Sequence, residues 1–162
     1  MKKVFIIIAT LFAAIAVRAA DTIKITVKQE GDLFAAIQAL DGLPTAVKID
    51  GSASSKIVVV PYHITAHARL ILARDLVVLQ ASLQSADKAR QGKFLEHSPD
   101  GKDIPPKTAE FVKYSAEIDQ INSTVDELPL QAITALDLNL DANEGIGGST
   151  LAALSPIIKQ AP

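Results

Sequence analysis

A stretch of 27 residues, 64–90, contains neither glycine nor proline and is rich in Ala, Leu and Arg. This composition favours one long helix, because glycine costs about 1 kcal/mol and proline about 3 kcal/mol in a helix interior. In its second half the apolar residues recur at alternating steps of four and three, which places them on one face. That seam consists of Leu72, Leu76, Leu79, Leu83 and Ala86.

The same spacing predicts a second helix over 107–125, whose seam consists of Phe111, Tyr114, Ile118, Ile121 and Val125. Each seam spans 14 residue steps, which is about 21 Å at the helical rise per residue. Equal seam lengths and a polar connecting segment favour an antiparallel helical hairpin over 63–125. In that register Phe111 would lie near Ala86, and Val125 near Leu72.

Alternating side chains precede the long helix. Thr22–Gln29 places Ile and Val residues on one side and Thr and Lys residues on the other, as a half-buried strand does. We expect a helix to follow, with Asp32 as its N-cap. Its apolar stripe would consist of Leu33, Ala36, Ile37 and Leu40.

Two further strands are predicted by the β-branched segments Ala46–Asp50 and Lys56–Val60, which flank the turn-forming segment Gly51–Ser55. Together with the preceding strand and helix they predict a small β-α-β-β sheet unit over 20–62. We therefore expect an α+β fold, in which this unit packs with the long antiparallel helical hairpin.

The remaining segment, 126–162, is rich in leucine and mixes the two periodicities. Asp137–Asp141 alternates and predicts a strand, whereas Leu151–Leu154 predicts a short helix that ends before Pro156. The roughly 143 residues that follow the first 19 are enough for one hydrophobic core. We expect one domain over 20–162.

The first 19 residues have the layout of a secretory signal peptide. Lys2 and Lys3 precede the apolar stretch Val4–Val17, and small residues follow at Ala19 and Ala20. The stretch is shorter than the roughly 20 apolar residues that a spanning helix needs. We expect cleavage after Ala19, with Ala20 and an uncleaved anchor as alternatives. The expected location is periplasmic or secreted, without a stable membrane span after cleavage.

Charge and cysteine content exclude several classes of protein. The chain has 16 basic and 18 acidic residues and no cysteine. Loss of Lys2, Lys3 and Arg18 with the leader would leave 13 basic residues and a net charge of about −5. This acidity argues against nucleic acid and anionic membranes as partners. The lack of cysteine excludes disulfides, thiol nucleophiles and Cys-ligated metal sites.

Asp137, Asn139 and Asp141 stand at alternate positions, as the oxygen ligands of a calcium loop do. Ala142 occupies the position where that loop needs glycine, and Gly148 the position where it needs a bidentate acid. The segment is thus a candidate calcium site, the alternative being the polar face of a strand whose leucines are buried.

His63 and His67 are four residues apart and would share one helix face if the helix began by Tyr62. Two imidazoles can hold zinc, but a further ligand is needed. The pair is therefore a candidate zinc site, and the alternative is an exposed pair near the helix start.

The loop predicted over 91–106 combines basic and apolar residues on an acidic chain: Lys93, Phe94 and Lys102. Such a loop at the turn of a hairpin favours contact with a protein partner, the alternative being a solvated connector. No serine lies in a nucleophile motif and no glycine loop precedes a phosphate-binding helix. We expect an exported, non-enzymatic interaction or accessory factor without a cofactor; the alternative is a small-ligand or divalent-metal-binding periplasmic module.

Overall fold

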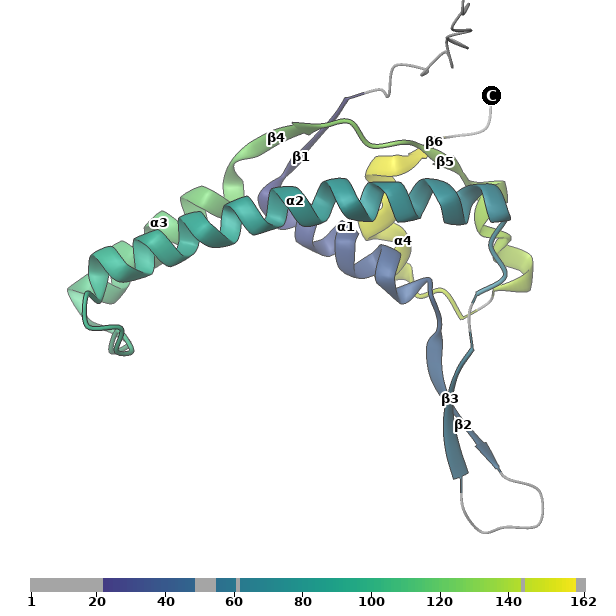
Figure 1. Cartoon of the computed structure of the whole chain (residues 1–162), viewed down its shortest axis with the longest axis horizontal. Helices are drawn as coiled ribbons and strands as arrows, with labels where there is room; N and C mark the ends of the chain where they lie inside the picture. Colours follow the sequence, from purple (N-terminus) through teal and green to yellow (C-terminus); the bar gives the residue numbers. More distant parts are fainter. Residues whose placement is uncertain (1–21, 49–54, 61, 144, 160–162) are drawn as a thin grey trace, which may run out of the picture.

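The computed structural model describes residues 22–48, 55–60, 62–143 and 145–159. The expected leader, 1–19, and residues 51–54 of the expected turn lie outside them. The chain is a mixed helix and strand protein of the α+β class, dominated by the 32-residue helix α2 (Ala66–His97) (Figure 1). Within the described residues, no helix combines the length and the apolar character that crossing a bilayer requires.

The first helix begins earlier than the alternating pattern predicted. β1 comprises only Ile23–Thr26, and α1 runs over Val27–Ala39. The Thr26 hydroxyl accepts a hydrogen bond from the Gln29 amide (3.2 Å), while the Gln29 side chain accepts one from the Thr26 amide (2.8 Å). This capping box satisfies two amides at the helix start. The predictions of a strand to Gln29 and of Asp32 as N-cap were therefore wrong.

The strands form three separate two-stranded sheets within the described part of the chain. β1 pairs antiparallel with β4 (Val125–Leu128), and β2 (Leu43–Lys48) with β3 (Ser55–Val60). β5 (Ile133–Thr134) and β6 (Ile158–Lys159) are parallel. The expected single β-α-β-β sheet was wrong: the elements occur in that order, but β1 bonds to a strand that follows α3, while β2 and β3 project from the helices (Figure 1).

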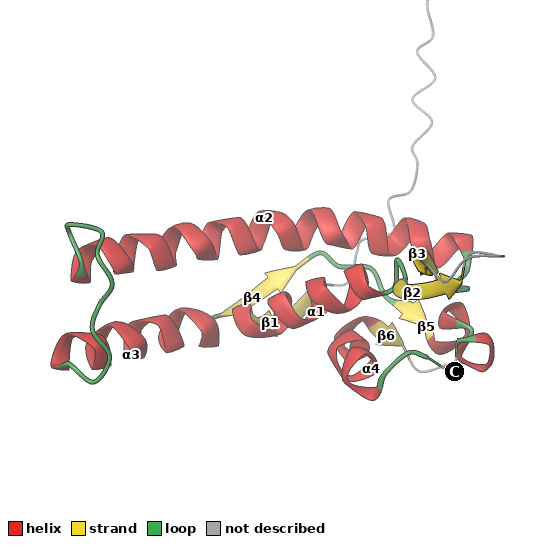
Figure 2. Cartoon of the chain, turned by 90° about the horizontal axis from the view of Figure 1, so that it is seen from below, coloured by secondary structure: helices red, strands yellow, loops and turns green. Residues whose placement is uncertain are grey.

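α2 extends to His97, and α3 covers Ala109–Ser123, so the connection is 98–108 rather than the predicted 91–106. The two helices lie side by side, and the connection joins them at one end (Figure 2). Their contacts join Arg90 to Asn122 through a 2.7 Å hydrogen bond. Farther out, Phe94 packs against Tyr114 with ring centroids 6.1 Å apart.

The expected contacts of Phe111 with Ala86 and of Val125 with Leu72 were wrong. Because α2 continues beyond residue 90, the residues that face α3 are those of its last turns. Phe111 is 36% exposed, and Val125 lies in β4 at 57% exposure.

The apolar seam of α2 nevertheless faces inward. Leu72, Leu79 and Ala86 are buried, and Leu76 and Leu83 are half-buried. The first half of this seam packs on α1 and the C-terminal segment instead of α3. The resulting core includes Leu33, Ile37, Leu40, Leu72, Leu79, Leu130, Ile133, Leu138, Leu154 and Ile157.

The strand predicted over Asp137–Asp141 was also wrong. Two 3-10 turns, Ala135–Leu138 and Leu140–Ala142, occupy this region. They meet at Asn139, whose backbone is left-handed (φ 47°), a conformation that Asn adopts more readily than most residues. The predicted final helix is present as α4 (Gly148–Leu154).

Candidate functional site

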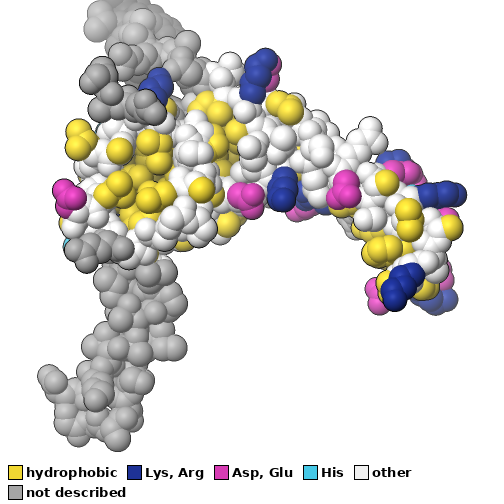
Figure 3. Space-filling view, turned by 180° about the vertical axis from the view of Figure 1, so that it is seen from behind, with side chains coloured by type: hydrophobic (Ala, Val, Ile, Leu, Met, Phe, Trp, Pro, Cys, Tyr) yellow, Lys and Arg dark blue, Asp and Glu magenta, His cyan; other side chains and the backbone are white. Residues whose placement is uncertain are grey.

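The last turns of α2, the connection 98–108 and α3 project from the body as an arm, residues 86–123 (Figure 1). α3 packs on α2 along one side and contains no buried residue. Leu95 is 48%, Phe111 36% and Val112 62% exposed near the far end of the arm. Seen from behind, hydrophobic side chains there lie among charges of both signs (Figure 3). The arm thus exposes apolar surface that two helices alone cannot cover.

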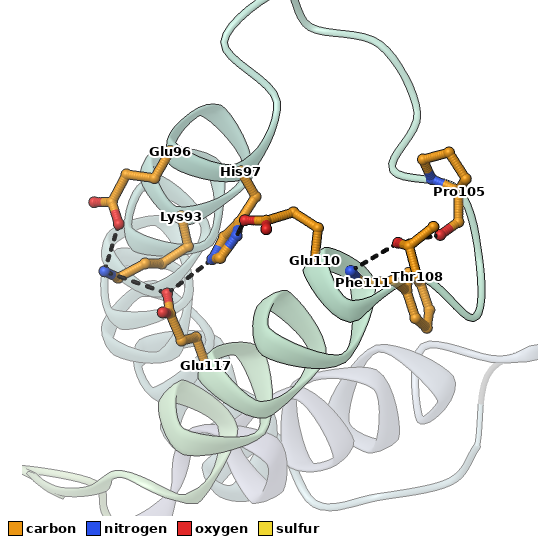
Figure 4. A network of polar contacts seen from close by, with 8 residues as sticks. All are labelled: Lys93, Glu96, His97, Pro105, Thr108, Glu110, Phe111 and Glu117. Carbon is orange, nitrogen blue, oxygen red and sulfur yellow. Dashed lines mark hydrogen bonds and ion pairs between the residues drawn. The ribbon is translucent and has the colours of Figure 1, made fainter.

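A network of charged side chains crosses from α2 to α3 beside this surface (Figure 4). The two ring nitrogens of His97 face different carboxylates: Nδ1 contacts Glu110, and Nε2 lies 3.4 Å from Glu117. Lys93 Nζ lies 3.3 Å from Glu117 and 2.7 Å from Glu96. Three charged groups of α2 and two of α3 therefore hold the end of the arm together.

The network favours the charged form of each of its central members. The hydrogen bond with Glu110 raises the pKa of His97, and Glu117 adds to this rise against the opposing effect of burial. Burial alone would raise the pKa of Glu117, yet Lys93 and His97 lower it overall. Hydrogen bonds with Glu96 and Glu117 raise the pKa of Lys93. The ion pairs are consequently strongest when His97 is protonated.

The contact of His97 with α3 is expected to weaken as pH rises. The pKa of His97 is raised above its usual 6.5, so its contribution is complete below that value and is lost as pH passes through the raised pKa. Proton NMR of the imidazole should give a titration midpoint above 6.5. Glu110→Gln should lower that midpoint, whereas Asp103→Asn in the exposed connection should not. A wild-type midpoint at or below 6.5 would contradict the assignment.

The connection itself is ordered by local hydrogen bonds. Ser98 is buried, and its hydroxyl donates to Asp100 (3.2 Å), which also pairs with Lys102 (2.7 Å). The Thr108 hydroxyl accepts a hydrogen bond from the Phe111 amide (3.1 Å) and caps α3. A cleft of about 520 Å³ lies between this connection and the ends of both helices. His97 and Glu110 line this cleft, and a carboxylate faces each ring nitrogen of His97.

The residues predicted for a protein contact occupy two different environments. Lys93 and Phe94 belong to α2 and not to a loop, and both contact α3. Lys102 lies in the connection, exposed, and pairs with Asp100. Lys93 and Phe94 serve the contact between the helices because α2 extends beyond them; the protein contact itself stays a prediction.

His63 and His67 do not share a helix face. α2 begins at Ala66 with Thr65 as its N-cap, so His63 precedes the helix. The His63 amide donates to the Asn143 side chain (2.7 Å), and His67 is exposed in the first turn. The condition on which the zinc hypothesis rested, a helix that begins by Tyr62, is not met.

Asp137, Asn139 and Asp141 do not surround one point. Both oxygens of Asp137 accept hydrogen bonds, one from Thr65 Oγ1 (3.0 Å) and the other from the amide and hydroxyl of Thr134. The backbone amide of Thr134 is the main cause of a lowered pKa at Asp137. Asn139 and Asp141 are exposed. Nowhere in the described ranges do three or more His, Cys, Asp or Glu side chains converge to hold a metal; calcium binding remains an untested prediction.

Two buried acids were missed by the sequence reasoning, namely Glu30 (0% exposed) and Asp75 (1%). Both occupy inward positions of helices, Glu30 three residues before Leu33 and Asp75 four before Leu79. The Thr26-Val27-Lys28-Gln29 capping box would have revealed that Glu30 belongs to the apolar stripe of α1.

No protein-family model, curated protein or solved structure matches this chain.

Proposed function

We propose that this protein is an exported, non-enzymatic interaction factor that binds another protein through the tip of the arm, residues 95–112. In this proposal α2 and α3 act as an antiparallel helical hairpin. The order of their contacts supports this, since Arg90 meets Asn122 whereas the later Phe94 meets the earlier Tyr114. The hairpin presents the tip away from the core, where a partner can reach it.

The observation that carries the proposal is the exposed apolar group at the tip, Leu95, Phe111 and Val112. It lies beside the ion-pair network of His97, so apolar and charged groups alternate over a short distance. Protein interfaces commonly combine an apolar centre with a polar rim. An apolar group at the end of a projecting hairpin is more accessible to a partner than one on the body.

Export rests on the signal-peptide layout of residues 1–19. An intact mass of the mature protein that begins at Ala20 would support it, and retention of Met1 in the exported protein would contradict it. The expected net charge of about −5 after cleavage also favours a protein partner over nucleic acid.

Replacing Leu95 and Val112 together with serine should abolish partner binding and leave the fold intact. Both side chains are about half-exposed or more, so each change should alter stability by no more than about 0.5 kcal/mol. The measurement is cross-linking at native expression level, followed by identification of the partners held by the wild type. Leu136→Ser is the matched control, because Leu136 is 81% exposed but lies in a 3-10 turn of the body.

The outcomes separate clearly. Specific partners that are lost in the double variant and kept in Leu136→Ser place the binding surface at the tip. The same partners retained by the double variant would exclude the tip as the binding surface.

A further inference from the structure

A buried carboxyl group lies at the base of the arm, away from the tip. Glu30 of α1 is fully buried, and neither of its carboxyl oxygens has a hydrogen-bond partner within the described residues. It interrupts the apolar stripe formed by Val27, Leu33 and Ile37. Burying an ionised carboxylate without a partner is costly, so Glu30 requires a proton or another compensating group.

The groups that face Glu30 come from two neighbouring elements. Asp126 of β4 lies beside it, and the Ser82 hydroxyl of α2 donates a 3.3 Å hydrogen bond to Asp126. Arg90 of α2 also acts on Glu30, but its guanidinium bonds Asp87 and Asn122. Of these two charged groups, Asp126 opposes the ionisation of Glu30 and Arg90 favours it.

These surroundings favour the neutral form of Glu30. Burial is the main cause that raises its pKa; the Ser82 hydroxyl lowers the pKa, the Asp126 carboxyl raises it further, and Arg90 lowers it. The negative charge of the half-exposed Asp126 disfavours ionisation of the buried Glu30, and a protonated Glu30 can donate a hydrogen bond to Asp126.

A metal ion is a poorer occupant than a proton. Calcium takes six to eight oxygen ligands and magnesium six. In the ranges that the structure describes, no three acidic or imidazole side chains converge. Two carboxyl groups and one hydroxyl supply fewer protein ligands than either ion takes.

We propose that Glu30 is protonated and donates a hydrogen bond to the Asp126 carboxylate, and that this bond holds α1 against β4 at the base of the arm. Asp126 lies two residues after Thr124, whose carbonyl accepts a 3.0 Å hydrogen bond from the Val27 amide at the start of α1. Loss of the proton places two negative charges between α1 and β4. The junction then opens more often, and the arm becomes less firmly attached to the body.

The direction of the pH effect follows from the raised pKa. The stabilising contribution of neutral Glu30 is complete below its ordinary pKa of 4.5. It is lost as pH rises through the raised value in the folded protein. The base of the arm should therefore be firmer in mild acid than in mild alkali.

Hydrogen exchange of the Val27 amide tests this proposal in the full-length chain. Protection factors, corrected for intrinsic exchange, should fall between about pH 5 and about pH 8, as the raised pKa of Glu30 requires. The comparison is made in an Asp75→Asn background, which removes the pH dependence due to the other buried acid. In that background Glu30→Gln should make the protection equal at both pH values, because the new side-chain amide cannot ionise and can donate to Asp126. Should Glu30→Gln fold poorly, Asp126→Asn is the second variant: it removes the neighbouring charge, so protection should fall less with pH than it does in the wild type. A fall as large as that of the wild type would overturn the pairing of Glu30 with Asp126.

Asp75→Asn alone is the matched control: it lacks the titration of Asp75 but keeps Glu30, so a pH dependence should remain at Val27. Equal protection of Asp75→Asn at both pH values would overturn the proposal, as would a pH-dependent fall that persists after Glu30→Gln is added to it. Addition of CaCl₂ or MgCl₂ at about pH 8 should have no effect; restored protection in the wild type alone would identify a bound cation in place of the proton.

Discussion

Leu79→Asp is expected to abolish the cooperative folding of this protein. Leu79 of α2 is fully buried and belongs to the same core as Leu33 and Leu130. Truncation of such a leucine costs about 2–5 kcal/mol. The new carboxyl group would also be buried without a partner, one helical turn from the buried Asp75. The total of more than about 5 kcal/mol approaches the whole stability of an ordinary domain.

Thermal unfolding followed by far-ultraviolet circular dichroism measures this effect. Val77→Asp introduces the same group on the same helix, but at a site that is 68% exposed. It should shift the free energy of unfolding by no more than about 0.5 kcal/mol. A wild-type transition in Leu79→Asp would show that α2 does not face the core at this position.

Asp75→Asn is expected to stabilise the protein above neutral pH. Asp75 is 1% exposed; one oxygen accepts a hydrogen bond from the Gln131 amide (3.0 Å), and the other has no partner within the described residues. Burial raises the pKa of Asp75 to about 6, against the opposing effect of the Gln131 hydrogen bond. The folded state therefore disfavours the ionised form, whereas the unfolded state accepts it readily.

The sign of the pH dependence follows directly. For an acid whose pKa rises from 3.8 to about 6 on folding, stability is complete below 3.8 and is lost as pH rises to about 6. Asn is neutral throughout and can still accept the hydrogen bond from Gln131. Between about pH 4 and about pH 8 the variant should gain about 2 kcal/mol relative to the wild type.

Urea unfolding at the two pH values measures this gain. The free energy of unfolding of the variant minus that of the wild type is compared between the two pH values, so that the contributions of all other groups cancel. Asp141→Asn is the control, because Asp141 is exposed and its removal should leave the pH dependence unchanged. A constant difference between the wild type and Asp75→Asn across this range would contradict a raised pKa at Asp75.

Local patterns in the sequence predicted the helices better than they predicted the contacts between them. The α2 seam was correctly assigned at Leu72, Leu79 and Ala86, because the helical period places residues seven apart on one face. The start of α1 was missed because the alternation of Thr22–Gln29 continues across a helix boundary. Thr26 decides that boundary through its side-chain hydrogen bond, which alternation does not report.

The candidate site was located only in part. The basic and apolar composition around Lys93 and Lys102 indicated the segment that joins α2 to α3, where Lys102 lies, whereas Lys93 belongs to α2. The pairing of His97 with Glu110 and Glu117 was not predicted, because it depends on where α2 ends and on the register of α3. A shift of one turn would bring other side chains opposite His97, so local spacing alone could not identify its partners.

The sequence by itself determined the α+β class, the long helix and the inward face of α2, since these depend on propensities and periodicities along a continuous stretch of chain. Only the tertiary structure decided that β1 pairs with β4 and that Glu30 lies beside Asp126. Strand pairing and buried charge both depend on residues about a hundred positions apart in the chain. Their energies arise from contact and from exclusion of water, which exist only once the chain has folded.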